Sequence, residues 1–155
     1  MEKKMEINGK DVYMVAVKAL MRDGIKLLLT HDIFDGGKWD LPGGRIKKFE
    51  FGKPLEEVLE RKLREELGDK VQYEIGEPKT FFQVQRNETL EEGGEMEVRI
   101  FGVGYEVEYL GGEIKLGEHH DKLEWVSVDD LKPEEYLKGG WEVGVANYIE
   151  KVRNS

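Results

Sequence analysis

The chain has 155 residues, no cysteine and a formal net charge of −9 at pH 7, and 37% of its residues are charged. This length is typical of one domain with a full hydrophobic core, so we expect a single domain over residues 1–155. The acidic balance argues against nucleic-acid binding. No apolar run or basic leader indicates a membrane span or a signal peptide. The lack of cysteine fits a reducing, cytoplasmic location.

Strand-like and helix-like segments alternate along the chain. Residues 12–20 are rich in apolar and β-branched side chains, residues 22–24 predict a turn, and residues 25–30 predict a second strand. Further on, the sequence predicts strands over 71–73, 80–85, 96–107 and 123–126, an acidic loop over 88–95, a short helix or turn over 129–137, and a terminal helix over 141–152. This alternation implies a layered α/β domain with a mixed sheet.

A helix is predicted over residues 54–67, shortly after the glycine turn Leu41-Pro42-Gly43-Gly44. At about 100° per residue, five side chains of this helix form one apolar stripe: Leu55, Val58, Leu59, Leu63 and Leu67. Lys62 and Glu66 fall inside the stripe, and Glu65 lies at its edge. Charged side chains on a buried face are costly unless they are paired or bind a metal. The helix therefore carries either a functional site or buried ion pairs.

Periodicity alone leaves both explanations open. Lys62–Glu66 and Arg61–Glu65 have the i,i+4 spacing of helical ion pairs, although the cation comes first, which is the weaker order. The glycine turn upstream favours a site, because backbone without Cβ atoms lets a ligand approach closely. Glu65 and Glu66 also supply the adjacent oxygen ligands that Mg²⁺ or Mn²⁺ prefers.

Together, the turn and the helix resemble the Nudix box, the signature of hydrolases that cleave nucleoside diphosphates linked to another group. The residues that match the box are Gly43, Gly44, Arg61, Leu63, Glu65, Glu66 and Gly68. The resemblance implies a Nudix-type α/β/α sandwich with a mixed β-sheet, and a hydrolase (pyrophosphatase) acting on a nucleotide diphosphate linkage. It also implies Mg²⁺ or Mn²⁺ as cofactor, a small nucleotide substrate, and a homodimer, since relatives are often dimers.

The chain departs from the box at three places. The segment between Gly44 and Arg61 is three residues longer than the pattern, so the upstream glutamate of the box is either Glu50 or is replaced by Lys53. Lys62 stands where the box has a glutamate after the arginine. By Coulomb repulsion, this lysine should weaken metal binding and reduce the number of ions held.

The resemblance implies a metal-binding role for several residues. Glu66 would be the principal ligand, and Glu65 a second ligand or the base that orients water. A carbonyl of Gly43 or Gly44 would contribute, and His119, counted back from the late tryptophan, falls where many relatives place a downstream ligand. A cation held in this way would bind diphosphate oxygens and activate water.

Three further residues would act on the substrate or on the ligands. Arg61 would orient the glutamates through charge-assisted hydrogen bonds, and Arg45 would contact phosphate. Lys62 allows two interpretations: Glu65 and Glu66 still bind a single cation, or the ammonium fills that space and the domain binds a phosphorylated ligand without efficient cleavage. A structural or partner-binding domain is the third alternative.

A histidine pair adds another hypothesis. In the segment Glu118-His119-His120-Asp121, His120 falls where GDP-mannose mannosyl hydrolases, a divergent Nudix branch, carry a histidine base. That branch also lacks the box glutamate at the position of Lys62, keeps the one that matches Glu66, and continues its turn as Gly43-Gly44-Arg45 does. A neutral imidazole is a suitable base for attack at a sugar carbon. Alternatively, both histidines are solvated surface residues.

Several other residues are weaker candidates for contacts with a nucleotide or a metal ion. His31 at a strand end could touch phosphate, but a surface histidine is the simpler interpretation. Phe101, Tyr105 and Tyr109 could stack on a nucleobase, although aromatic residues in strands more often belong to the core. The glutamates of residues 88–95 could lend a metal ligand, or form a solvated loop.

Overall fold

The fold is known from a computed structural model that describes residues 3–34 and 36–155. Its main sheet contains β1 (Lys3–Lys4), β4 (Tyr13–Asp23), β5 (Lys26–Asp32), β6 (Lys38–Asp40), β7 (Gly43–Arg45), β8 (Gln72–Thr89), β9 (Glu95–Gly111) and β10 (His120–Ser127). The short strands β2 (Glu6–Ile7) and β3 (Lys10–Asp11) form a separate hairpin. The helices are α1 (Leu55–Leu67), α2 (Gly139–Arg153) and the 3₁₀ turns η1 (Lys48–Glu50) and η2 (Pro133–Glu135).

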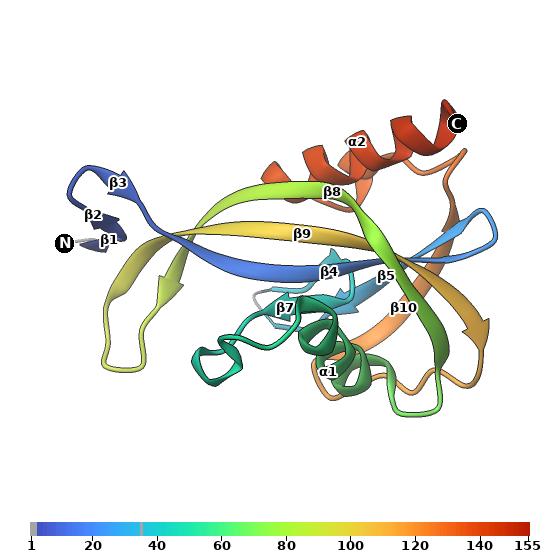
Figure 1. The fold of residues 1–155 in the computed structure, drawn as a ribbon, viewed down its shortest axis with the longest axis horizontal. Helices are drawn as coiled ribbons and strands as arrows, with labels where there is room; N and C mark the ends of the chain where they lie inside the picture. Colours follow the sequence, from blue (N-terminus) through green and yellow to red (C-terminus); the bar gives the residue numbers. More distant parts are fainter. Residues whose placement is uncertain (1–2, 35) are drawn as a thin grey trace.

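The sheet is mixed and lies between the two helices. β9 pairs with β4 in parallel and with β8 in antiparallel orientation, and β5 pairs antiparallel with β10. In Figure 1, α2 lies above the long strands and α1 lies below them. This arrangement confirms the predicted α/β/α sandwich with a mixed β-sheet.

A divergence between two neighbouring strands creates room at the centre of the molecule. β4 and β5 pair only beside their connecting turn, at Arg22 and Asp23. Farther along, β4 pairs instead with β7 through Ala16–Lys18, while β5 pairs with β6 and β10. The glycine turn of β7 is therefore held against the middle of β4.

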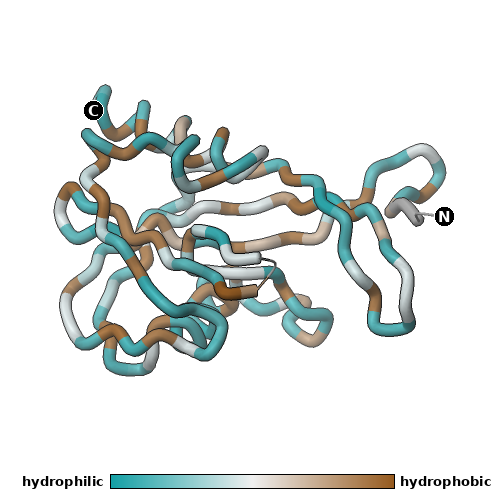
Figure 2. The backbone as a smooth tube through the Cα atoms, turned by 180° about the vertical axis from the view of Figure 1, so that it is seen from behind, coloured by the Kyte–Doolittle hydropathy of each residue, from teal (hydrophilic) through white to brown (hydrophobic). Residues whose placement is uncertain are grey.

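Two hydrophobic clusters, one on each face, hold the helices to the sheet. On the α1 face, Leu59, Leu63 and Leu67 are buried against residues such as Val17 and Val103. On the α2 face, the buried side chains include Leu20, Phe82, Val145, Tyr148 and Ile149. In Figure 2, hydrophobic stretches recur along the central strands, whereas the outer turns are mainly hydrophilic.

The helix after the glycine turn agrees with its prediction to within one residue. α1 begins at Leu55, Pro54 is its N-cap, and Gly68 ends it with a φ of 91°. A positive φ of this kind is the conformation that glycine adopts without steric cost.

The strand predictions need one correction. The segments 71–73 and 80–85 belong to a single strand, β8, which continues to Thr89, so that the turn to β9 is shorter than residues 88–95. Glycine and proline, as in Gly76-Glu77-Pro78, are typical of turns, but the strand passes through this segment with register shifts on both sides of Pro78. Among the described residues, β8 pairs only with β9, and an edge strand tolerates a proline because one side of it needs no hydrogen bond.

The remaining segments follow the predictions more closely. Within residues 129–137, only Pro133–Glu135 is helical, as a single 3₁₀ turn. The terminal helix α2 extends the predicted range by two residues at its start and one at its end. No helix in the described residues is long and apolar enough to cross a membrane.

Candidate active site

The glycine turn forms one wall of the candidate active site, where β7 pairs with β4. A Cβ atom on Gly43, whose φ is 138°, would lie 2.1 Å from the carbonyl oxygen of Val17. A Cβ atom on Gly44 would lie 2.4 Å from Cε of Lys62. Backbone atoms therefore fill the space beside Gly43, whereas the space beside Gly44 is filled by the Lys62 side chain.

Three charged side chains of α1 face this turn. Glu65 and Glu66 follow Lys62 by three and four residues, so the three side chains lie on one face of the helix. The Nζ atom of Lys62 lies 3.5 Å from Oε2 of Glu65 and 3.9 Å from Oε2 of Glu66. The i,i+4 ion pair that the sequence suggested for Lys62 and Glu66 is thus present, but it lies in a cleft beside the glycine turn.

Glu66 is the most buried carboxylate of this group. The N–H of Gly43 donates a hydrogen bond to its Oε2 atom at 3.1 Å, and Nε2 of His120 lies 3.3 Å from its Oε1 atom. Burial raises the pKa of Glu66 to about 7, although the positive charges of Lys18 and Lys62 and the Gly43 hydrogen bond oppose this rise. Burial disfavours the charged form of Glu66, so a proton donor or a cation in contact with this carboxylate would stabilise it.

Arg61 pairs with two carboxylates, the exposed Glu65 and the buried Glu50. Its guanidinium donates to Glu50 at 2.6 and 2.7 Å and to Oε1 of Glu65 at 2.9 Å. The Arg61 hydrogen bonds lower the pKa of Glu50 to about 2, against the effect of burial, and the N–H of Lys47 also donates to this carboxylate. Of the two positions that the sequence left open, Glu50 contacts Arg61, whereas Lys53 is exposed.

The histidine pair borders the same cleft at the start of β10, where His119 precedes the strand and His120 is its first residue. The side chain of His120 is 7% exposed, and among the described residues its Nδ1 atom is buried without a hydrogen-bond partner. Burial lowers the pKa of His120, which favours the neutral form of its imidazole. The ring of His119 packs against Phe34, with a centroid distance of 4.6 Å. His120 therefore reaches Glu66, and His119 forms part of the cleft wall.

The cleft consists of two adjoining hollows of about 530 and 500 Å³, which share Asp32, Asp40, Gly43 and Lys62. Glu65, Glu66 and the two histidines line the first hollow. The second has an apolar wall of Ala16, Ile100 and Trp141, and its cationic side chains are Lys18, Lys38, Arg45, Lys62 and Arg86. These volumes lie within the usual range for small-molecule sites.

Arg45 lines the second hollow in an ion pair with β8. Its guanidinium donates to the two carboxylate oxygens of Glu88 at 2.5 and 2.7 Å. Deeper in the cleft, Nζ of Lys18 donates to Asp40 at 2.9 Å and to the carbonyl of Leu41 at 3.2 Å. The sequence reading missed Lys18, although a lysine within the apolar segment 12–20 was a usable signal.

The donor chemistry of the first hollow fits a hard divalent cation, but only in part. Carboxylates are the ligands that Mg²⁺ and Mn²⁺ prefer. Nevertheless, residues 3–34 and 36–155 contain no group of three or more His, Asp or Glu side chains placed to hold a metal ion. The ammonium of Lys62 lies within 4 Å of both Glu65 and Glu66. Glu65 and Glu66 could therefore hold a divalent cation only if the Lys62 ammonium moved away and other oxygen atoms completed the ligand set.

The weaker candidates mostly have structural partners. His31 pairs with Asp121 at 2.7 Å and contacts the edge of Trp39. Tyr105 is buried in the α1-side core, and Phe101 and Tyr109 pack against the same core. The exposed residues Glu91, Glu92 and Glu95 occupy the β8–β9 turn region, so Glu88 is the glutamate of segment 88–95 that lines the cleft.

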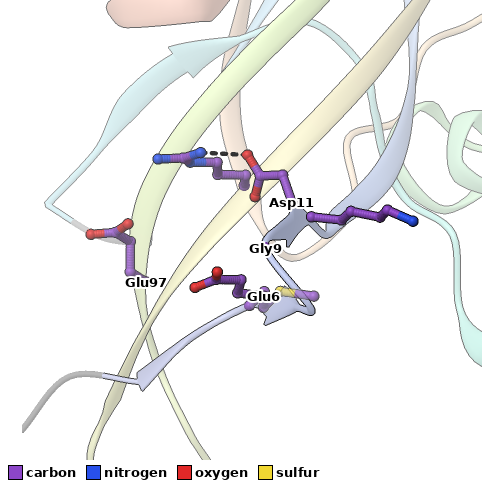
Figure 3. A pocket seen from close by; sticks show the side chains of 7 residues that line it. Glu6, Gly9, Asp11 and Glu97 are labelled. Carbon is purple, nitrogen blue, oxygen red and sulfur yellow. Dashed lines mark hydrogen bonds and ion pairs between the residues drawn. The ribbon is translucent and has the colours of Figure 1, made fainter.

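A separate hollow of about 260 Å³ lies under the N-terminal hairpin, at the far end of the molecule (Figures 1 and 3). Figure 3 shows Glu97 on β9 and Glu6 and Asp11 on the β2–β3 hairpin, with a contact from Arg99 to Asp11. The residues that the sequence predicted to carry function all lie elsewhere. The cleft beside the glycine turn is therefore the candidate active site.

Comparisons with known proteins identify the family of the chain. Residues 12–144 match the model of the NUDIX domain family. The nucleoside triphosphatase NudI of Escherichia coli O139:H28 is 32% identical over 95 residues, which cover 61% of this chain and 65% of the relative. The match therefore spans slightly less than two thirds of the relative's own length.

Solved structures show the same fold at lower sequence identity. The MutT protein from Methanosarcina mazei Go1 has a TM-score of 0.63 at 24% identity, with 92% of this chain and 94% of that chain covered. An ADP-ribose pyrophosphatase from Streptococcus suis 89-1591 has a TM-score of 0.61 at 18% identity, with 92% and 93% covered. At these identities the likeness shows the fold alone.

Proposed function

The chain belongs to the NUDIX domain family, and on this basis we propose that it hydrolyses a diphosphate linkage in a nucleoside diphosphate or triphosphate derivative with the help of Mg²⁺ or Mn²⁺. The observation that carries the proposal is the position of Glu66. This buried carboxylate lines the first hollow, where it meets the Gly43 N–H, His120 and Lys62. The names of the relatives, NudI nucleoside triphosphatase and ADP-ribose pyrophosphatase, support the same class of substrate.

The proposed roles of the chain's own residues follow from this geometry. Glu66 and Glu65 bind the cation, and a carbonyl of the glycine turn, that of Gly44, supplies a further oxygen. His119 borders the hollow and is the additional candidate ligand. The cation, when bound, supplies Lewis-acid activation of the phosphate and of the attacking water.

Two arginines act on either side of these carboxylates. Arg61 holds Glu65 in place by a hydrogen bond of 2.9 Å and is itself fixed by Glu50. Arg45 lies in the second hollow, where its guanidinium fork suits the planar geometry of phosphate oxygens. Substrate phosphate would compete with Glu88 for this fork.

A second function of the same fold is favoured by one observation on His120. Its ring is buried beside Glu66, its Nδ1 atom has no hydrogen-bond partner among the described residues, and burial lowers its pKa, which favours the neutral form. These properties suit a base that activates water for attack at a sugar carbon, as in the hydrolysis of a GDP-sugar. The two functions differ in which bond breaks and therefore in their products.

Lys62 favours a third possibility, a nucleotide-binding domain without efficient catalysis. Its ammonium already pairs with Glu65 and Glu66 and lines both hollows, where it would attract phosphate. This alternative predicts nucleotide binding, seen as a thermal shift, without turnover.

One experiment separates the three functions. The purified protein is incubated with Mg²⁺ or Mn²⁺ and with GDP-mannose, ADP-ribose and nucleoside triphosphates, and the products are resolved by chromatography. A nucleoside monophosphate indicates attack at phosphorus, GDP with free sugar indicates attack at carbon, and binding without turnover indicates the noncatalytic domain. Glu66→Gln should abolish the turnover, whereas Glu57→Gln, an exposed glutamate of the same helix, is the matched control.

The proposed homodimer and the cytoplasmic location remain predictions. Sedimentation equilibrium of the wild-type protein tests the first. Localisation of the tagged protein in its native cell tests the second.

A further inference from the structure

The position of Lys62 is determined by one α-helix and one glycine. Lys62 precedes Glu65 and Glu66 by three and four residues, so all three side chains leave α1 on the same face. Across the cleft, Gly44 of β7 leaves a notch where a Cβ atom would lie 2.4 Å from Cε, 3.0 Å from Nζ and 3.2 Å from Cδ of Lys62. The lysine stem lies in this notch, with its ammonium directed to the two carboxylates.

The ammonium has the charge and the surroundings of a resident cation. It lies 3.5 Å from Glu65 and 3.9 Å from Glu66, and its side chain is only 23% exposed. Its positive charge opposes the rise in the pKa of Glu66 that burial causes. A divalent cation bound by the same two carboxylates would be repelled by the ammonium at this distance, although the 48% exposure of Glu65 lets water screen part of the repulsion.

We propose that Lys62, seated in the notch above Gly44, is a built-in counter-cation that occupies the metal position between Glu65 and Glu66 in the nucleotide-free protein. The inference rests on the proposed function in one respect, namely that these glutamates are the metal ligands. A divalent cation reaches them only when Lys62 leaves the notch. Lys62 also lines the second hollow, where the phosphates of a nucleotide would give its ammonium new partners.

A consequence is that metal and nucleotide bind cooperatively. Without nucleotide, the cation must displace Lys62 from two carboxylates and leave the ammonium unpaired. With nucleotide, phosphate oxygens complete the cation's ligand set and also pair with the displaced ammonium. Each ligand therefore raises the affinity for the other by the same factor.

Direct measurement of Mn²⁺ binding by electron paramagnetic resonance, at fixed pH and without nucleotide, tests the proposal. We expect Lys62→Met to bind Mn²⁺ at least tenfold more tightly than the wild type, and Lys62→Glu to bind it more tightly still. Lys53→Met, which removes an exposed lysine of the preceding loop, should leave the affinity unchanged. Equal Mn²⁺ affinity in wild type and Lys62→Met would overturn the proposal.

A second variant tests the notch itself and keeps the lysine. Gly44 has no positive φ, so alanine fits its backbone, and the new Cβ atom would meet only the flexible end of Lys62 closely enough to displace it. Gly44→Ala should therefore also tighten Mn²⁺ binding, whereas an unchanged affinity would show that the notch does not hold the ammonium. Thermal denaturation checks that each variant is folded.

Binding of Mn²⁺ is measured on the resting protein, so its outcome is independent of turnover. If no nucleotide is hydrolysed by any variant, the hydrolase proposal fails while the Mn²⁺ affinities still decide the role of Lys62. The cooperative step is tested with a non-hydrolysable nucleoside triphosphate analogue, which should raise the Mn²⁺ affinity of the wild type at least tenfold and that of Lys62→Met less.

Discussion

The ion pair between Arg61 and Glu50 predicts an asymmetric response to mutation. Glu50 is 2% exposed, whereas the side chain of Arg61 is 20% exposed and has a second partner in Glu65. Arg61→Met leaves a buried carboxylate without its cation, which costs about 3–5 kcal/mol. Glu50→Gln leaves an arginine that can still reach Glu65 and water, so we expect a cost of about 1–2 kcal/mol. At about 2–4 °C per kcal/mol, the melting temperature should fall by about 6–20 °C and about 2–8 °C, respectively.

The pH dependence of this difference is a further test. The pKa of Glu50 is lowered from its ordinary 4.5 to about 2, chiefly by the hydrogen bonds from Arg61. A lowered pKa in the folded state gives a stabilisation that is present above pH 4.5 and is lost as the pH falls toward 2. Because Arg61→Met lacks this stabilisation, the gap between wild type and variant should close over the same pH window.

Thermal denaturation followed by circular dichroism between pH 2.5 and 7.5 measures both effects. Arg64→Met is the matched control, since Arg64 is an exposed arginine of the same helix, and its effect should stay within about 0.5 kcal/mol. The reasoning is refuted if Glu50→Gln destabilises as much as Arg61→Met, or if the gap between wild type and Arg61→Met is independent of pH.

Three other substitutions give distinct expectations. His120→Ala should lower kcat by about 10²–10⁴-fold if its imidazole is the base; unchanged steady-state kinetics would exclude that role. Arg45→Ala should raise the KM of the nucleotide about tenfold by loss of a charge-assisted phosphate contact. Glu88→Gln weakens the ion pair that competes for Arg45, so it should lower the KM. A shift of both KM values in one direction would contradict this reasoning. Gly144→Ala should cost about 1–3 kcal/mol by overpacking, because its Cβ atom would lie 2.2 Å from the ring of Phe82; an unchanged melting temperature would be the contrary result.

The fold was largely predictable because its helices and strands carry clear local signals. α1 has a proline at its start, a glycine at its end and a regular apolar stripe, so its limits were predicted to within one residue. β8 was harder to predict, because the sequence Gly76-Glu77-Pro78 is typical of a turn. Its continuity depends on pairing with β9 and on its edge position, which are tertiary properties that the local sequence does not encode.

The candidate site was predictable to the extent that its residues share one helix. The positions of Lys62, Glu65 and Glu66 in or beside the apolar stripe indicated buried charge, and the structure places them at the cleft. Contacts between distant segments were not predictable in the same way. The pairing of Arg45 with Glu88 joins residues 43 positions apart, and no pattern in either segment indicates it.

The notch at Gly44 shows why a family pattern alone could not decide the role of Lys62. The pattern identifies the missing glutamate and predicts weaker metal binding from charge, but it does not say where the ammonium lies. An exposed lysine at that position would be screened by solvent and would change the metal affinity little. Because the stem is seated against Gly44, the ammonium remains within 4 Å of both carboxylates.

The net negative charge of the chain disfavours the approach of an anionic nucleotide, so the cationic side chains of the cleft matter for binding. With a formal net charge of −9, the protein repels an anionic nucleotide at low ionic strength, whereas at physiological salt this repulsion is screened beyond about 8 Å. Under the proposed function, substrate capture then depends on the local cations of the second hollow, among them Arg45 and Lys62, which are both paired with carboxylates. On the same proposal, phosphate would exchange with Glu88 and a divalent cation with Lys62, so we expect each exchange to be more favourable when nucleotide and cation enter together.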